Sequence, residues 1–177
     1  MVEGCRIARL GEAHALTVWD GVRRTPVREL LGVAAFGVNA YTADEPGQRV
    51  IEEHDHAGPG GQEELYVVLA GRAAFAIDGS ELDAPAGTLL FVHPRARRGA
   101  TACEPGTTVL VVGAPPGAPY AAPPWPAEAA MWRYRELFAA GEYDRAVAFL
   151  ETTLERFPGN PGILAEIEHC RRAQTRS

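Results

Sequence analysis

The sequence predicts a mainly β protein, an antiparallel barrel or jelly roll followed by a small helical extension. Three observations lead to this prediction. Short runs rich in β-branched or aromatic residues recur between residues 33 and 112, and turn-forming segments separate them. No helical periodicity lies between these runs, which favours a barrel over alternating strands and helices. After a proline-rich segment, the spacing of apolar residues changes to that of helices.

The barrel is expected to span residues 31–113, because the strand-like pattern begins there. Residues 1–30 show no clear pattern and are taken as an N-terminal arm. The intervening segments are rich in glycine, proline and aspartate, as in ADEPG, AGPGG, DGS and APAG, which is typical of tight turns. We expect strands at residues 33–41, 49–54, 65–69, 72–77, 88–93, 98–103 and 107–112.

A linker and a helical tail follow the barrel. Residues 114–126, APPGAPYAAPPWP, can form neither a helix nor a central strand, because proline lacks the backbone donor that both require. The tail, residues 127–177, is expected to form three helices. They are predicted at residues 128–140, 143–156 and 161–173.

The tail resembles part of a tetratricopeptide repeat. Residues 141–158 match its second half in the Gly-x-Tyr-Asp turn and the closing proline, and residues 161–173 would begin a repeat that is never finished. About three such repeats are needed for a stable stack. The tail should therefore pack on its own barrel, on a second copy of the chain or on a protein partner. Its candidate anchors are Trp125, Trp132, Tyr134 and Phe138.

Composition excludes several classes of function. A length of 177 residues suits one core with an appendage, and a net charge of −6 argues against nucleic acid or an anionic membrane as the main partner. No segment approaches the roughly 18 apolar residues of a membrane span, and the first residues show no signal-peptide pattern. The three scattered cysteines predict neither a disulfide framework nor a zinc ribbon. These features together predict a cytoplasmic protein.

Two residue types are too scarce for some kinds of catalysis. The chain contains no lysine, so Schiff-base chemistry and a P-loop are excluded. Serine occurs only at Ser80, in an expected turn, and at Ser177, which argues strongly against a serine hydrolase.

The strongest functional signal is the pair His54 and His56, followed by Glu64. Side chains two apart on an extended segment point the same way. A carboxylate on the next strand can complete two imidazoles and one oxygen, a set that leaves open positions on a divalent transition metal. Taken alone, the histidine pair could also be a solvated polar edge.

Two spaced motifs resemble those of the cupin superfamily. The first comprises Gly47, the His54/His56 pair, Glu64 and Gly71, and the second comprises Gly79 and residues 85–87, Pro-Ala-Gly. The spacing to Gly71 selects Glu64 over Glu63 as the inward carboxylate, although the gap after His56 is longer than is common. The resemblance covers about residues 31–115. It implies the cupin double-stranded β-helix, a jelly-roll barrel that holds a divalent metal and forms a homodimer.

The second motif departs from the family pattern at the fourth ligand. Alignment places that histidine at Arg98, and arginine stays protonated and cannot coordinate a cation. His93 is the nearest histidine, but it lies at the corner before Pro94. We expect His93 to cap a strand end, with contact to a ligand or to the metal as alternatives.

Two interpretations of the site stay open. In the first, His54, His56 and Glu64 hold Fe, Mn, Ni or Zn, and Arg98 binds an anionic group of the substrate through its planar fork. In the second, Arg98 pairs with Glu64 and weakens metal binding by Coulomb repulsion, leaving a metal-free pocket. In either case Tyr66 should share the inward face with Glu64.

Three functions are compatible with these features. The first is a metal-dependent enzyme of oxygenase or isomerase type acting on a small polar or anionic molecule, with Tyr66 donating a hydrogen bond or a proton. The second is a non-catalytic, metal-free protein that binds or senses a small anion through Arg98. The third is a protein-interaction module that uses the helical tail.

Overall fold

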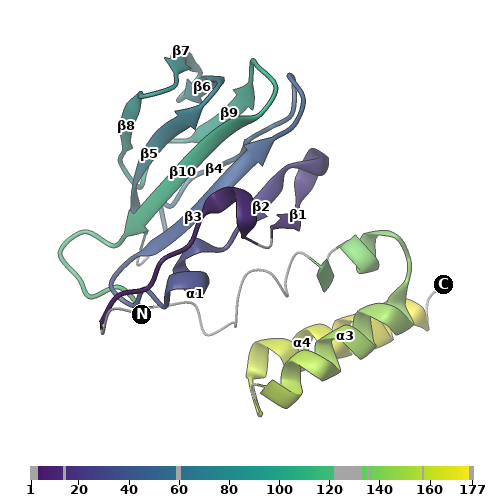
Figure 1. Ribbon diagram of the computed structural model, residues 1–177. Coiled ribbons are helices and arrows are strands. Elements are labelled where there is room, and N and C mark those ends of the chain that lie inside the picture. Colours follow the sequence, from purple (N-terminus) through teal and green to yellow (C-terminus); the bar gives the residue numbers. More distant parts are fainter. Residues whose placement is uncertain are drawn as a thin grey trace. The chain divides into compact units, whose positions relative to one another are not determined.

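The computed structural model describes residues 4–13, 15–58, 61–121, 133–134, 136–156 and 158–175. The chain divides into two compact units, Met1–Ala122 and Pro123–Ser177. The first unit is built from antiparallel strands and the second from helices (Figure 1). The predicted fold class, mainly β with a short helical extension, is confirmed.

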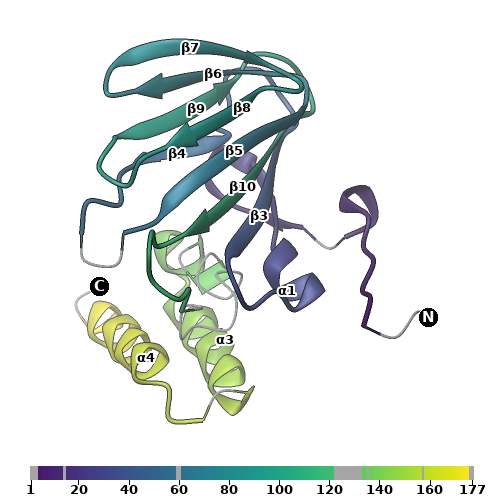
Figure 2. The ribbon, with the colours of Figure 1, turned by 90° about the vertical axis from the view of Figure 1, so that its left-hand side faces the viewer.

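Two antiparallel sheets form the first unit, stacked as two layers (Figure 2). The six-stranded sheet has the order β1 (Leu16–Thr17), β2 (Arg23–Thr25), β3 (Gly37–Ala43), β10 (Thr107–Ala114), β5 (Glu63–Ala70) and β8 (Leu89–Val92). The four-stranded sheet has the order β4 (Ile51–His54), β9 (Arg98–Ala102), β6 (Arg72–Ile77) and β7 (Ser80–Pro85). The short helices of this unit are η1 (Leu10–Glu12), η2 (Trp19–Gly21) and α1 (Val27–Leu31).

Each predicted strand run contains a strand, and the described part of the chain has three further strands. β1 and β2 come from the predicted arm; β2 pairs with β3, and β1 pairs with β2. β7 is an edge strand in which only Ala84 is buried, so its sequence lacks the apolar alternation of a half-buried strand. Its signal is the turn before it: Asp78 and Gly79 have φ values of 48° and 81°, as in a two-residue hairpin.

The core lies between the inner faces of the two sheets. Tyr66 of β5 and Phe75 of β6 come from different sheets, and their rings meet edge to face with centroids 5.4 Å apart. Both side chains are almost fully buried, as are Val68 of β5 and Val109 of β10. Burial of such side chains is the main force that holds the sheets together.

Gly71 occupies a position where any other residue would be strained. Its φ is +68°, and a Cβ there would lie 2.8 Å from the Cα of Thr107. We expect Gly71→Ala to lower the free energy of unfolding by roughly 2 kcal/mol or more, because left-handed strain and a backbone clash add. Gly79→Ala is the control, since Gly79 has a φ of +81° but open space around it. Urea unfolding should show the larger loss at Gly71, and equal losses would contradict the clash.

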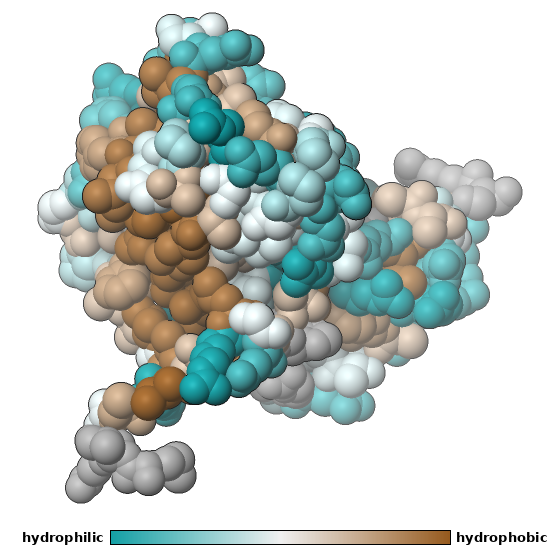
Figure 3. Space-filling model, turned by 45° about the horizontal axis from the view of Figure 1, so that its top comes forward, coloured by the Kyte–Doolittle hydropathy of each residue, from teal (hydrophilic) through white to brown (hydrophobic). Residues whose placement is uncertain are grey.

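The outer surface of β5 and β8 carries exposed apolar side chains. Leu65 lies opposite Phe91 in the strand register, and Leu89 and Leu69 are also exposed. Figure 3 shows apolar residues gathered in a band on the face that it presents. The homodimer implied by the family resemblance stays a prediction.

The second unit is a helical hairpin of α3 (Tyr143–Arg156) and α4 (Pro161–Gln174), and these two predicted helices are confirmed. Of the first predicted helix, residues 133–134 and 136–139 are helical and residue 140 lies in a turn; its other residues, Trp132 included, lie outside the described residues, as does Trp125. Tyr134 and Phe138 pack in this unit's own core. Within the described residues, no helix has the length and apolar character that crossing a membrane requires.

Candidate metal centre

The end of β4 positions the two histidines. His54 is the last residue of the strand, and His56 lies two residues later with its amide donating to the carbonyl of Pro94. The Nδ1 atom of His54 lies 2.7 Å from the carbonyl of Glu52. In the tautomer that donates this hydrogen bond, Nε2 keeps its lone pair for a ligand. Both imidazoles are about one-third exposed.

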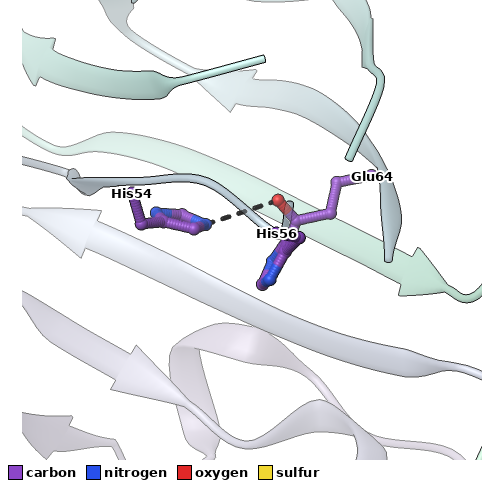
Figure 4. A group of neighbouring side chains, drawn as sticks. All are labelled: His54, His56 and Glu64. Atoms are coloured by element: carbon purple, nitrogen blue, oxygen red, sulfur yellow. Dashed lines mark ion pairs between the residues drawn. The ribbon is translucent and has the colours of Figure 1, made fainter. Parts of the chain in front are cut away.

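Glu64 meets the histidines from the other sheet. It lies on β5, and its carboxylate oxygens are 3.5 Å from Nε2 of His54 and 3.3 Å from Nε2 of His56. One ligand atom from each residue lies within 4.8 Å of the other two, and Figure 4 shows the side chains pointing toward one another. The carboxylate does come from the next strand along the chain, but that strand belongs to the opposite sheet.

Arg98 lies behind the carboxylate. It pairs with His54 in the β4–β9 register, is fully buried, and places Nη2 2.9 Å and Nε 3.1 Å from Oε2 of Glu64. Its Nη1 donates to the carbonyls of Ala96 and Pro94, at 2.8 and 3.4 Å. The ion pair of the second interpretation is therefore present. A ligand could reach the guanidinium only by displacing these contacts.

Solved structures of other proteins share the barrel. A cupin protein from Bacteroides fragilis aligns with a TM-score of 0.52 at 17% identity, over 69% of this chain and 93% of that one. KdgF from Halomonas sp. aligns with a TM-score of 0.51 at 18% identity, over 60% and 92%. A predicted oxalate decarboxylase from Thermotoga maritima aligns with a TM-score of 0.50 at 19% identity, over 62% and 98%. The first unit has the cupin fold. No family model and no curated protein sequence matches the chain.

Tyr66 shares the interior of the cupin barrel with Glu64. Its hydroxyl donates to Oε2 of Glu64 at 2.5 Å, and Arg98 donates to the same hydroxyl at 3.3 Å. Burial and the neighbouring negative charge of Glu64 raise the pKa of Tyr66 above its ordinary value. The phenol therefore keeps its proton at neutral pH and holds the carboxylate.

The charges of this site support one another. Burial alone would raise the pKa of Glu64, but hydrogen bonds from His54, His56 and Tyr66 outweigh it and hold the pKa below its usual range. The hydrogen bond to Glu64 raises the pKa of His54, against the opposing effects of burial and of Arg98. Glu64 is thus an anion at neutral pH, which is the form that a metal ligand requires.

His93 lies apart from this cluster. It is exposed at the corner after β8, and its Nδ1 accepts a hydrogen bond from the amide of Arg95 at 3.4 Å. The cupin barrel brings together His54, His56, Glu64, Tyr66 and Arg98. Contact between His93 and a ligand stays a prediction.

The donor set fits a divalent transition metal. Oε2 of Glu64 receives hydrogen bonds from Arg98 and Tyr66, whereas Oε1 faces His56. One oxygen of Glu64 and one nitrogen of each imidazole therefore lie close enough together to share one ion. Imidazole and carboxylate ligands suit Fe, Mn, Ni and Zn. The positive charge of Arg98 opposes metal binding, and its contact with Glu64 offsets part of the charge that would attract the metal.

Two polar residues that the sequence did not single out, Gln62 and Tyr120, lie over Gly113 and Gly37, the next two residues across the strands from Glu64. Gln62 precedes Glu64 by two residues, so strand alternation could have placed the two side chains on one face. Tyr120 belongs to the proline-rich segment after β10, where no periodic signal indicates a direction.

Proposed function

We propose that the barrel binds one divalent transition metal through His54, His56 and Glu64 and acts as an enzyme on a small polar or anionic molecule. The observation that carries this proposal is the convergence of three ligand atoms within 4.8 Å from two different sheets. Charged and polar groups are costly to bury, and a barrel held only by packing would place apolar residues there. The partly exposed imidazoles leave the site accessible from solvent.

Each residue has a distinct part in this proposal. His54 and His56 supply nitrogen ligands, and Glu64 supplies one oxygen. Arg98 and Tyr66 bind the other oxygen and fix the carboxylate, as partners of metal ligands commonly do. When bound, such a metal polarises an oxygen of the substrate and lowers the pKa of bound water. Tyr66 keeps its proton and holds the carboxylate throughout.

The charge of the site favours an anionic substrate. A divalent ion, Glu64 and Arg98 together carry a net positive charge when both imidazoles are neutral. One structure of the same fold is a predicted oxalate decarboxylase, and oxalate is a small dianion. Oxygenase and isomerase reactions on small carboxylates are therefore the first to be screened.

Elemental analysis tests this proposal. Protein purified without an affinity tag or a chelator is expected to contain close to one transition metal per chain, or to take one up after anaerobic reconstitution. A metal-bearing protein would then be screened with oxygen and small acids. Failure to bind any transition metal under both conditions would contradict the proposal.

The ion pair between Arg98 and Glu64 favours a second candidate, a metal-free protein that binds small anions. This candidate predicts that small anions raise the melting temperature of the metal-free protein. Arg98→Ala should then remove that effect.

A further inference from the structure

Two glycines lie in the same cross-strand row as Glu64. In the strand register Glu64 of β5 pairs with Gly113 of β10, and Gly113 pairs with Gly37 of β3. Figure 2 shows these three strands side by side. A Cβ at Gly113 would lie 3.2 Å from Cγ of Glu64, so this row faces the same side as the carboxylate. Because glycine has no side chain, β10 and β3 contribute none to the inner face at these two positions beside Glu64.

Polar ends of two other side chains lie over these glycines. The amide oxygen of Gln62 lies 2.9 Å from the position of a Cβ at Gly113, and the hydroxyl of Tyr120 lies 3.2 Å from that of a Cβ at Gly37. Both side chains are partly exposed. Within the described part of the chain, neither side chain forms a hydrogen bond. Two neutral groups that can both donate and accept hydrogen bonds therefore lie along the row that starts at Glu64, one over each of its next two strand neighbours.

We propose that Gln62 and Tyr120 recognise the hydroxyl group of a small hydroxycarboxylate whose carboxylate is bound at the metal. This inference rests on the proposed metal site, which supplies the positive charge for the carboxylate. The recognition groups are uncharged, so they suit a neutral hydroxyl better than a second anion. Adjacent strands lie about 4.8 Å apart, so the hydroxyl is held roughly 5–10 Å from Glu64. A chain of about four carbons spans that distance.

Binding of two matched probes to the manganese-loaded protein tests the inference. 4-Hydroxybutyrate and butyrate differ only in the terminal hydroxyl. In calorimetric titrations the wild type is expected to bind 4-hydroxybutyrate about tenfold more tightly, the effect of one well-formed hydrogen bond. Tyr120→Phe and Gln62→Met are each expected to reduce this preference severalfold. Neither should change the affinity for butyrate or for Mn(II).

Two further variants control for indirect effects. Gly37→Ala places a methyl group against the Tyr120 hydroxyl without a backbone penalty, because the φ of Gly37 lies outside the left-handed region. It should reduce the preference as Tyr120→Phe does. Thr108 of β10 lies on the face of the sheet opposite to that of Gly113, and its hydroxyl is hydrogen-bonded to that of Thr42. Thr108→Val removes this hydroxyl. It should leave the preference unchanged.

The outcomes separate this inference from the function on which it rests. Failure of the wild type to bind Mn(II) or any other divalent transition metal overturns both. Normal Mn(II) binding with equal affinity for the two probes overturns the recognition role alone. If both Tyr120→Phe and Gln62→Met keep the full preference for 4-hydroxybutyrate over butyrate, the recognition role is likewise overturned.

Discussion

Replacement of Glu64 by glutamine is expected to abolish metal binding. The amide is a neutral and weaker ligand, and it cannot offset the charge of the metal beside Arg98. Loss of a group that only orients a metal ligand costs 10- to 100-fold in affinity, so loss of this ligand should cost about 100-fold or more. Titration with Mn(II) and elemental analysis of the purified variant measure the effect. A stoichiometric metal content in Glu64→Gln would contradict the assignment.

The same substitution should also destabilise the barrel, because Arg98 would stay buried without its counterion. Removal of one partner of a buried ion pair costs about 3–5 kcal/mol. The double variant Glu64→Gln/Arg98→Met separates the two effects. It removes the isolated cation and should recover much of the free energy of unfolding, whereas metal binding stays lost. If the double variant regained both stability and metal binding, the loss of metal binding in Glu64→Gln would be a result of unfolding and not of the missing ligand.

Replacement of Arg98 by methionine is expected to have opposite effects on stability and on metal affinity. Without metal, Glu64 would lose its buried cation, and the free energy of unfolding should fall by about 3–5 kcal/mol. Metal affinity should rise, because removing the Coulomb repulsion between the guanidinium and the metal outweighs the loss of one group that orients Glu64, whose carboxylate still accepts the hydrogen bond of Tyr66. Bound metal should therefore stabilise Arg98→Met more than it stabilises the wild type. Urea unfolding with and without Mn(II) measures both effects.

Arg97 provides the matched control. It is the preceding residue, it is exposed, and its ion pair is with Glu53 on the surface. Surface ion pairs contribute little to stability, so Arg97→Met should change neither the unfolding midpoint nor the response to metal appreciably. A similar loss of stability in both variants would show that the buried contacts of Arg98 are not the cause.

Local patterns in the sequence were sufficient to find the candidate metal ligands. Alternation along an extended segment placed His54 and His56 on one side, and motif spacing selected Glu64 over its neighbour Glu63. Motif alignment also placed Arg98 in the site, where it lies opposite His54 in the register. The sequence could bring these side chains together because strand alternation and register are fixed over a few residues, while their role as metal ligands stays a prediction.

Features that depend on long-range pairing could not be predicted in the same way. β1 is two residues long and β2 is three; β2 forms by pairing with β3, and β1 forms by pairing with β2. β7 is mostly exposed, so no apolar pattern marks it. The position of Tyr120 over Gly37 joins residues 83 positions apart in the chain, and nothing near either residue encodes it.

Because the candidate metal ligands are divided between the two sheets, a bound metal would crosslink the two layers of the barrel. His54 belongs to the four-stranded sheet and Glu64 to the six-stranded sheet. A metal bound by both would resist any motion that parts the layers. Escape of the metal would then require the layers to separate or the ligands to detach one at a time. The lifetime of the bound metal would in that case report directly on how rarely the barrel opens.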